Sequence, residues 1–156
     1  MNNTTLALAA LASTLISCHP DQPETNLSHE PALIFPRGEP ITNDTFVGTA
    51  WLTMLVTADS TNHTAVGNVT FEPGARTNWH RHPAGQIVLV TGGVGYYQEQ
   101  GRPKKILRKG DVVVWPPQVP HWHGASSDSV FVQLAITGRE KGPTEWLQAV
   151  SEEYRR

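Results

Sequence analysis

Between Phe46 and Thr137, closely spaced turn residues divide the sequence into short segments of strand-forming residues. Glycine, proline, asparagine and aspartate favour turns, because each suits a backbone conformation or local hydrogen bond that regular strands do not use. Many short strands at regular spacing, without helical patterns between them, are typical of an all-β sandwich or barrel. We expect strands at residues 47–56, 64–71, 77–82, 86–91, 95–100, 105–107, 111–115, 121–125 and 130–137.

Two His-x-His pairs lie in this region, His80 with His82 and His121 with His123. Alternate side chains of a strand point to the same face, so the two imidazoles of a pair can share one metal ion. Gln86 follows a short turn and can return its amide oxygen to the same point. Imidazole and neutral oxygen ligands suit a divalent first-row metal. One such pair is more often an ordinary surface feature, but two pairs favour a metal site.

The spacing around both pairs matches the two sequence motifs of the cupin family. The first motif, G(x)5HxH(x)3E(x)6G, is matched by Gly74, His80, His82, Gln86 and Gly93. Gln86 stands where most members carry glutamate. The second motif, G(x)5PxG(x)2H(x)3N, is matched by Gly110, Pro116 and His121. Two of its positions differ, because Gln118 replaces the glycine and Ala125 replaces the asparagine.

The region from Phe46 to Arg156 therefore resembles the small single-domain cupins. Within them, the phrases TFEPGARTNWHRHPAGQ, KGDVVVWPP and HWHGA resemble the bacterial manganese-dependent hydroxynitrile lyases and their relatives. This resemblance implies an all-β fold, the cupin double-stranded β-helix or jelly roll.

The resemblance also implies a metal centre. By this resemblance, the metal ligands are His80, His82, Gln86 and His121. The expected ion is manganese, with iron, nickel or zinc as alternatives. All four ligands are neutral, so the bound ion keeps its full double charge and favours an anionic ligand. His123 shares a face with His121 and is the candidate catalytic acid or base. Its alternative role is to line the pocket.

Alternation along the strands predicts the substrate pocket. If His80 and His82 face inward, Asn78 does so too, whereas Trp79 and Arg81 face outward. The predicted pocket residues are Val69, Phe71, Asn78, Phe131 and Gln133. A small, mostly apolar cavity beside a metal suits a small organic substrate.

For a hydroxynitrile lyase, the metal would bind and acidify a cyanohydrin hydroxyl, and His123 would accept its proton as the C–C bond breaks. Active lyases of this family carry a further histidine on a late strand, where this chain has Gln133. Two alternatives remain open, because one fold hosts many reactions. One is a metal-dependent cupin dioxygenase or decarboxylase, and the other is a non-catalytic periplasmic protein that binds a small ligand or a metal.

The N-terminus suggests export. Residues 6–16 form an apolar stretch too short to cross a membrane but suited to a signal peptide. Residues 15–18 resemble a lipobox, which makes Cys18 a candidate lipid anchor. We therefore divide the chain into a signal segment (1–18), a tether (19–40) and a cupin domain (41–156), and expect a periplasmic or outer-surface lipoprotein. Residues 1–5 contain no lysine or arginine, so a frayed apolar N-terminus is the alternative.

The formal net charge of -2 gives no indication of a nucleic-acid partner. In residues 143–153, Trp146, Leu147 and Val150 lie at helical spacing, with Thr144 as a candidate N-cap. We expect one short helix there, packed on the barrel or on a partner subunit. We expect a homo-oligomer, either a dimer or a tetramer.

Overall fold

The computed structural model describes residues 32–151. The predicted signal segment with Cys18, and residues 19–31 of the predicted tether, lie outside this range. Within it the chain forms strands and no helix, so no described segment is a membrane-spanning helix. The prediction of an all-β domain is confirmed.

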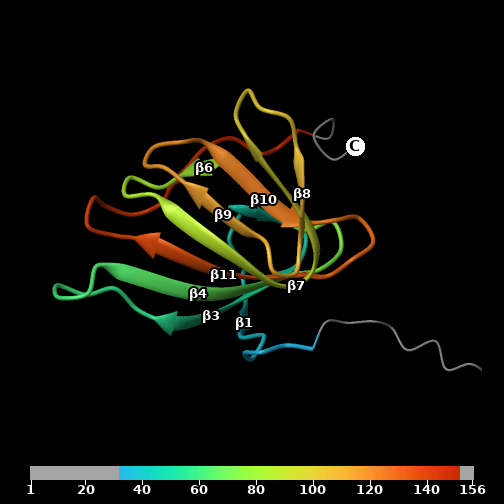
Figure 1. The fold of residues 1–156 in the computed structure, drawn as a ribbon, viewed down its shortest axis with the longest axis horizontal. Helices are drawn as coiled ribbons and strands as arrows, with labels where there is room; N and C mark the ends of the chain where they lie inside the picture. Colours follow the sequence, from blue (N-terminus) through green and yellow to red (C-terminus); the bar gives the residue numbers. More distant parts are fainter. Residues whose placement is uncertain (1–31, 152–156) are drawn as a thin grey trace, which may run out of the picture.

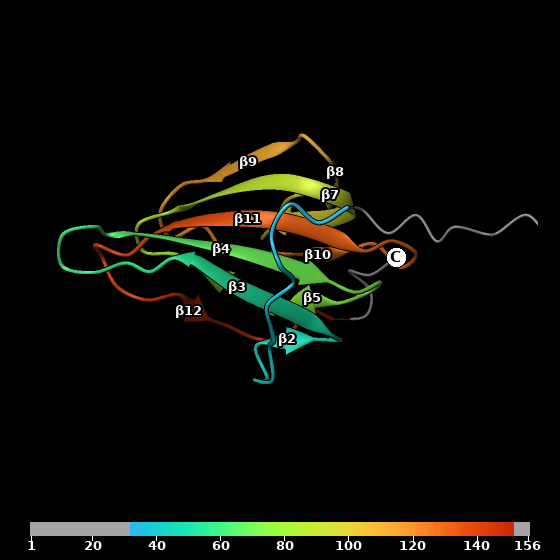
Figure 2. The ribbon, with the colours of Figure 1, turned by 90° about the horizontal axis from the view of Figure 1, so that it is seen from below.

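In residues 32–151, twelve antiparallel strands pair into one strongly curled sheet (Figure 1). The strands are β1 (Glu39–Pro40), β2 (Phe46–Val47), β3 (Ala50–Val56), β4 (Thr64–Phe71), β5 (Arg76–Thr77), β6 (His80–Arg81), β7 (Gln86–Glu99), β8 (Lys105–Arg108), β9 (Val112–Trp115), β10 (His121–Ala125), β11 (Phe131–Gly138) and β12 (Glu145–Trp146). The main path of the sheet runs β1-β3-β4-β11-β7-β10-β5-β2. One layer, with β9, β7, β11, β4 and β3 in succession, is seen in Figure 2.

The long strand β7 joins the two sides of the curled sheet. Its first residues pair with β9 and β11, and its last residues pair with β8 and β10. Gly93 lies at the bend with a φ of 70°, and a Cβ there would meet the carbonyl oxygen of Val130. The two separate strands predicted at 86–91 and 95–100 are therefore one bent strand, and glycine permits the bend.

Apolar side chains fill the interior of the curled sheet. Phe71, Val88, Trp115 and Phe131 are almost fully buried there. Along β9, buried Val113 and Trp115 alternate with exposed Val112 and Val114, as the period of two along a strand requires. This core supports the strands that carry the histidine pairs.

A bulge interrupts the strand predicted at 77–82. Arg76 lies opposite Gly124 and His80 opposite His121, so four steps on one strand match three on β10. One extra residue reverses the alternation of side chains. Thr77 rather than Asn78 therefore faces the interior, and the predicted inward direction of Asn78 is wrong. The Asn78 side chain instead donates to the Asp44 carbonyl at 2.9 Å.

The C-terminal helix predicted at residues 143–153 is absent from residues 143–151, the part of it that the structure describes. Glu145–Trp146 instead form β12, which pairs with β6. The backbone N–H of Leu147 donates to the Trp79 carbonyl at 2.8 Å. Pairing with β6 and Trp79 satisfies backbone groups that a helix would have paired internally. The segment still packs on the barrel, because Val150 is buried against Trp79 and Trp122.

Candidate metal centre and adjoining cavity

Three histidines converge inside the curled sheet. His80 on β6 and His121 on β10 are directly opposite each other, and His82 follows β6. Each offers one ring nitrogen, and these three atoms lie within 4.8 Å of one another. All three residues are buried. The structure therefore brings together three of the four predicted metal ligands at a spacing that suits one ion.

Hydrogen bonds orient the imidazoles toward a common point. Nδ1 of His80 lies 3.0 Å from the Asn78 carbonyl, and Nδ1 of His121 lies 2.8 Å from the Val119 carbonyl. Since a carbonyl can only accept, each Nδ1 carries the proton, and each Nε2 keeps a free lone pair. Nε2 of His82 and of His121 is buried and has no hydrogen-bond partner among residues 32–151. Unpaired buried acceptors are costly unless a ligand uses them, and a metal ion would do so.

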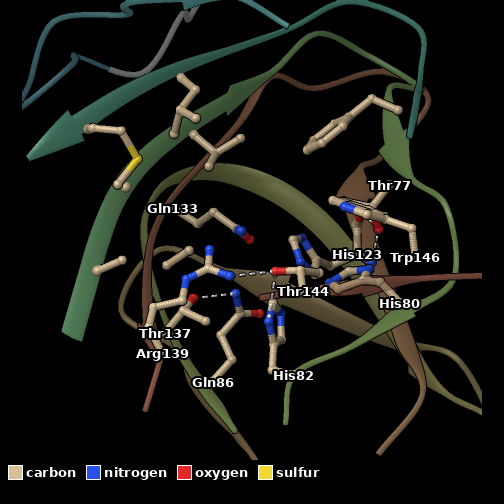
Figure 3. A pocket seen from close by; sticks show the side chains of 17 residues that line it. Thr77, His80, His82, Gln86, His123, Gln133, Thr137, Arg139, Thr144 and Trp146 are labelled. Carbon is tan, nitrogen blue, oxygen red and sulfur yellow. Dashed lines mark hydrogen bonds between the residues drawn. The ribbon is translucent and has the colours of Figure 1, made fainter. Parts of the chain in front are cut away.

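Gln86 supplies a fourth neutral donor. Its amide Nε2 donates to the Thr137 hydroxyl at 3.0 Å, which leaves Oε1 facing the histidines (Figure 3). Oε1 is buried and has no partner within the described residues. Three imidazole nitrogens and one amide oxygen fit a divalent first-row metal.

Burial keeps the cluster neutral. Loss of hydration lowers the pKa of His80 to about 4, of His82 to about 3 and of His121 to about 2. Repulsion from the His80 imidazolium adds to the lowering of the pKa of His82 and His121. Near neutral pH these rings are therefore unprotonated, which is the form that binds metal.

His123 lies beside the cluster on β10. Its ring centre is 5.2 Å from that of His80, and its backbone N–H donates to the Thr77 hydroxyl at 3.2 Å. The Nδ1 atom is buried and unpartnered among the residues described. Burial holds the pKa of His123 well below its usual value. The ring is therefore neutral near neutral pH.

A cavity of about 120 Å³ adjoins the cluster. Its lining includes His80, His82, Gln86 and His123, together with apolar side chains of β3, β4 and β11. Its size is close to that of a cavity, about 150 Å³, that holds one benzene molecule. A small organic molecule can therefore lie beside the histidines.

Two of the five predicted pocket residues, Val69 and Gln133, line this cavity. Phe71 and Phe131 belong to the adjacent core, and Asn78 points away because of the bulge. Their assignment to the pocket wall is not supported by the geometry. Gln133 is fully buried, and neither of its amide atoms has a partner within residues 32–151.

The cavity lining also contains five polar or aromatic residues that sequence reasoning missed, namely Phe46, Thr77, Arg139, Thr144 and Trp146. Arg139 continues the alternation from Gln133 through Thr137, just past the end of β11, so the strand pattern contained the signal for it. Thr144 and Trp146 were missed because their segment was predicted to be a helix. The ring of Trp146 lies 4.9 Å from that of His80.

Residues 67–137 match the family model described as a cupin domain. An (R)-mandelonitrile lyase from Granulicella tundricola is 43% identical over 115 residues, covering 72% of this chain and 88% of that protein. The name of this relative gives it a lyase activity on mandelonitrile.

Solved structures give the same fold. A cupin-like protein from Thermotoga maritima is 52% identical, with a TM-score of 0.76, over 80% of this chain and 96% of that chain. A cupin 2 conserved barrel protein from Rhodopseudomonas palustris has a TM-score of 0.59 at 17% identity, over 74% of this chain and 77% of that one. The predicted jelly roll is confirmed by these likenesses, and the second one supports the fold alone.

Proposed function

This chain belongs to the cupin family, and on that premise we propose that it is a metal-dependent lyase that cleaves or forms cyanohydrins. The proposal is carried by one observation, the converging free nitrogens of the histidine cluster beside a small, mostly apolar cavity. The relative named as an (R)-mandelonitrile lyase supports the choice of reaction.

His80, His82, His121 and Gln86 would hold the ion. When bound, a divalent ion supplies Lewis acidity and a fixed point for the substrate oxygen. Manganese is our proposal for the ion, on the resemblance to the manganese-dependent lyases. The ligand chemistry alone suits several first-row metals.

His123 is our proposed proton acceptor. The substrate hydroxyl gives its proton to the neutral imidazole, the C–C bond breaks, and its electron pair leaves with cyanide, which gives an aldehyde. In the synthetic direction His123 returns the proton. General base catalysis of this kind is typically worth about 100- to 10,000-fold in rate.

Gln133 bears on how fast the reaction runs. Its amide is buried in the cavity wall without a partner among residues 32–151, so a polar group of the substrate can pair with it. A neutral amide is a poor base at the position where the active lyases are expected to carry histidine. We therefore expect modest activity.

The test is a cleavage assay on mandelonitrile with the metal-loaded protein. We expect a rate above background, a loss of about 100-fold or more in His123→Ala with the metal retained, and a gain in Gln133→His. Metal content of each variant, measured by mass spectrometry, separates a lost base from a lost ion. A metal-replete protein without turnover on any aromatic cyanohydrin, and without a gain in Gln133→His, would exclude the lyase reaction.

We propose further that the chain is exported and anchored through Cys18. The support is the sequence of residues 6–18, and the residues concerned lie outside the described range. Intact-mass analysis of the membrane fraction should find an acylated Cys18 as the first residue. An intact Met1 or an unmodified Cys18 there would exclude the anchor.

A further inference from the structure

Arg139 brings a positive charge to a cavity that no acidic side chain of residues 32–151 lines. It directly follows the end of β11 and lines the cavity beyond Thr137. Its Nη1 donates to the Thr144 hydroxyl at 3.1 Å, and the same hydroxyl lies 3.2 Å from Nδ1 of His82 (Figure 3). A single threonine therefore links the guanidinium to one of the candidate metal ligands.

The charge of Arg139 has no acidic partner within residues 32–151. No aspartate or glutamate of this part of the chain lines the cavity. The nearby Glu145 pairs instead with Arg81 at 2.7 Å. Partial burial lowers the pKa of Arg139, yet a guanidinium stays protonated in proteins. A half-buried guanidinium without an acidic partner among these residues is available to pair with an anionic ligand.

Arg139 also stands where the cavity opens. A shallow outer groove shares Met54, Ala65 and Arg139 with the cavity lining. The remaining groove residues are uncharged. A ligand that enters along the groove therefore passes the guanidinium, and a positive charge at the entrance of a cleft attracts anions.

We infer that Arg139 is a carboxylate-binding residue and that the substrate is a small anion, a carbonyl compound or cyanohydrin that carries a carboxylate group. The guanidinium fork binds a carboxylate with two hydrogen bonds, while Thr144 fixes the position of the fork. The neutral ligand set adds to this selection, because a divalent ion held by it keeps its full charge. The inference rests on the proposed function in one respect, that the cavity beside the histidines is the substrate site.

The test compares two probes of nearly equal shape, benzoate and benzamide, which differ by one negative charge. Isothermal titration calorimetry of the protein, both metal-loaded and metal-free, should show preferential binding of benzoate. Arg139→Gln should weaken benzoate about 10- to 100-fold, the usual worth of a charge-assisted pair, and leave benzamide within about twofold. Arg139→Lys should recover part of the loss, since it keeps the charge without the fork.

Two controls make the result specific. Lys141→Gln removes an exposed cation two residues away and should leave both affinities unchanged. Thr144→Val keeps the charge but removes the hydroxyl that holds Arg139, and it should weaken benzoate several-fold in the metal-free protein. The inference is wrong if Arg139→Gln leaves the benzoate-to-benzamide ratio unchanged, or if Lys141→Gln lowers it equally.

Failure of the inference and failure of the proposed function give different results. Arg139-dependent benzoate binding without cyanohydrin turnover would exclude the lyase and retain the carboxylate site. Turnover of mandelonitrile with no preference for benzoate would do the opposite.

Discussion

Two backbone carbonyls, those of Asn78 and Val119, determine which ring nitrogens of His80 and His121 carry a proton. By accepting from Nδ1 of His80 and His121 they leave both Nε2 atoms without a proton. Free imidazole lone pairs in a buried, neutral cluster are what a metal ion requires. The residues outside the ligand set thus determine which nitrogen binds.

Removing one ligand should remove most of the metal. We expect His80→Ala and His121→Ala each to purify with a small fraction of the metal content of the parent, because two histidines and one amide hold a divalent ion weakly. The measurement is metal analysis of protein purified without a chelating resin. His63→Ala, at an exposed histidine outside the cluster, is the matched control. Full occupancy in both ligand variants would refute the assignment.

The Gln86→Glu variant should show whether metal affinity and the rate of cyanohydrin turnover can change independently. A glutamate oxygen adds a negative charge beside the ion, so we expect metal affinity to be equal or higher and cyanohydrin turnover to fall by several-fold or more. A competition assay with a chelator gives the affinity, and the same sample gives the rate. An unchanged rate in a metal-replete variant would show that a neutral ligand is not needed there.

At the scale of strands, the outer face of the sheet carries one continuous apolar row. A row of aligned side chains crosses five strands, namely Val114, Ile87, Ile136, Val66 and Val56. Val114 is 62% exposed and Ile87 38% exposed. Contiguous apolar surface of this kind commonly marks an interface, and two sheets can pack face to face across it.

The expected homo-oligomer therefore has a candidate interface in this row, and its occupant would be a second copy of the chain. Val114→Glu should shift the protein toward the monomer in sedimentation velocity, because a charge within a dry interface is strongly unfavourable. Val47→Glu, an exposed apolar position off the row, should have no effect. A wild type that is monomeric at high concentration would contradict the expectation.

Much of the arrangement of strands could be predicted from the sequence. The predictions that were wrong have local physical causes. The turn residues placed the strands, and the two His-x-His pairs led to the metal cluster. No residue type near Asn78 and Trp79 predicts the bulge, because the bulge depends on how this segment pairs with β10. The spacing of Trp146, Leu147 and Val150 suits a helix, yet the open edge of β6 provides backbone partners that a single sequence cannot reveal.

At the scale of the whole molecule, the buried imidazoles should make stability depend on pH. The pKa of His80 is lowered to about 4 from 6.5, so the unfolded chain binds more protons than the folded one between these values. The contribution is complete above pH 6.5 and is lost as pH falls toward 4. At 1.36 kcal/mol per pKa unit, it amounts to about 3 kcal/mol for this residue.

Urea unfolding of the metal-free protein at several pH values between 7.5 and 4 measures this effect. We expect the free energy of unfolding to decrease steadily on acidification, and His80→Asn to flatten the slope. His63→Asn, at the exposed position, should leave the slope unaltered. A stability that stays constant from pH 7 to pH 5 would show that folding does not lower the pKa of these imidazoles.

The pairing of β12 with β6 has a consequence for how the site comes into being. Gln86 and Thr137 are 51 residues apart, His82 and Thr144 are 62 apart, and Arg81 and Glu145 are 64 apart. Contacts this distant in sequence form late in folding, after the loops between them have closed. The centre therefore takes shape only once synthesis has passed Glu145, and no earlier fragment presents the candidate ligands with the contacts that hold them. Capture of a metal ion would then act as a final selection step, since an ion that binds only the folded form stabilises it over every partly folded form.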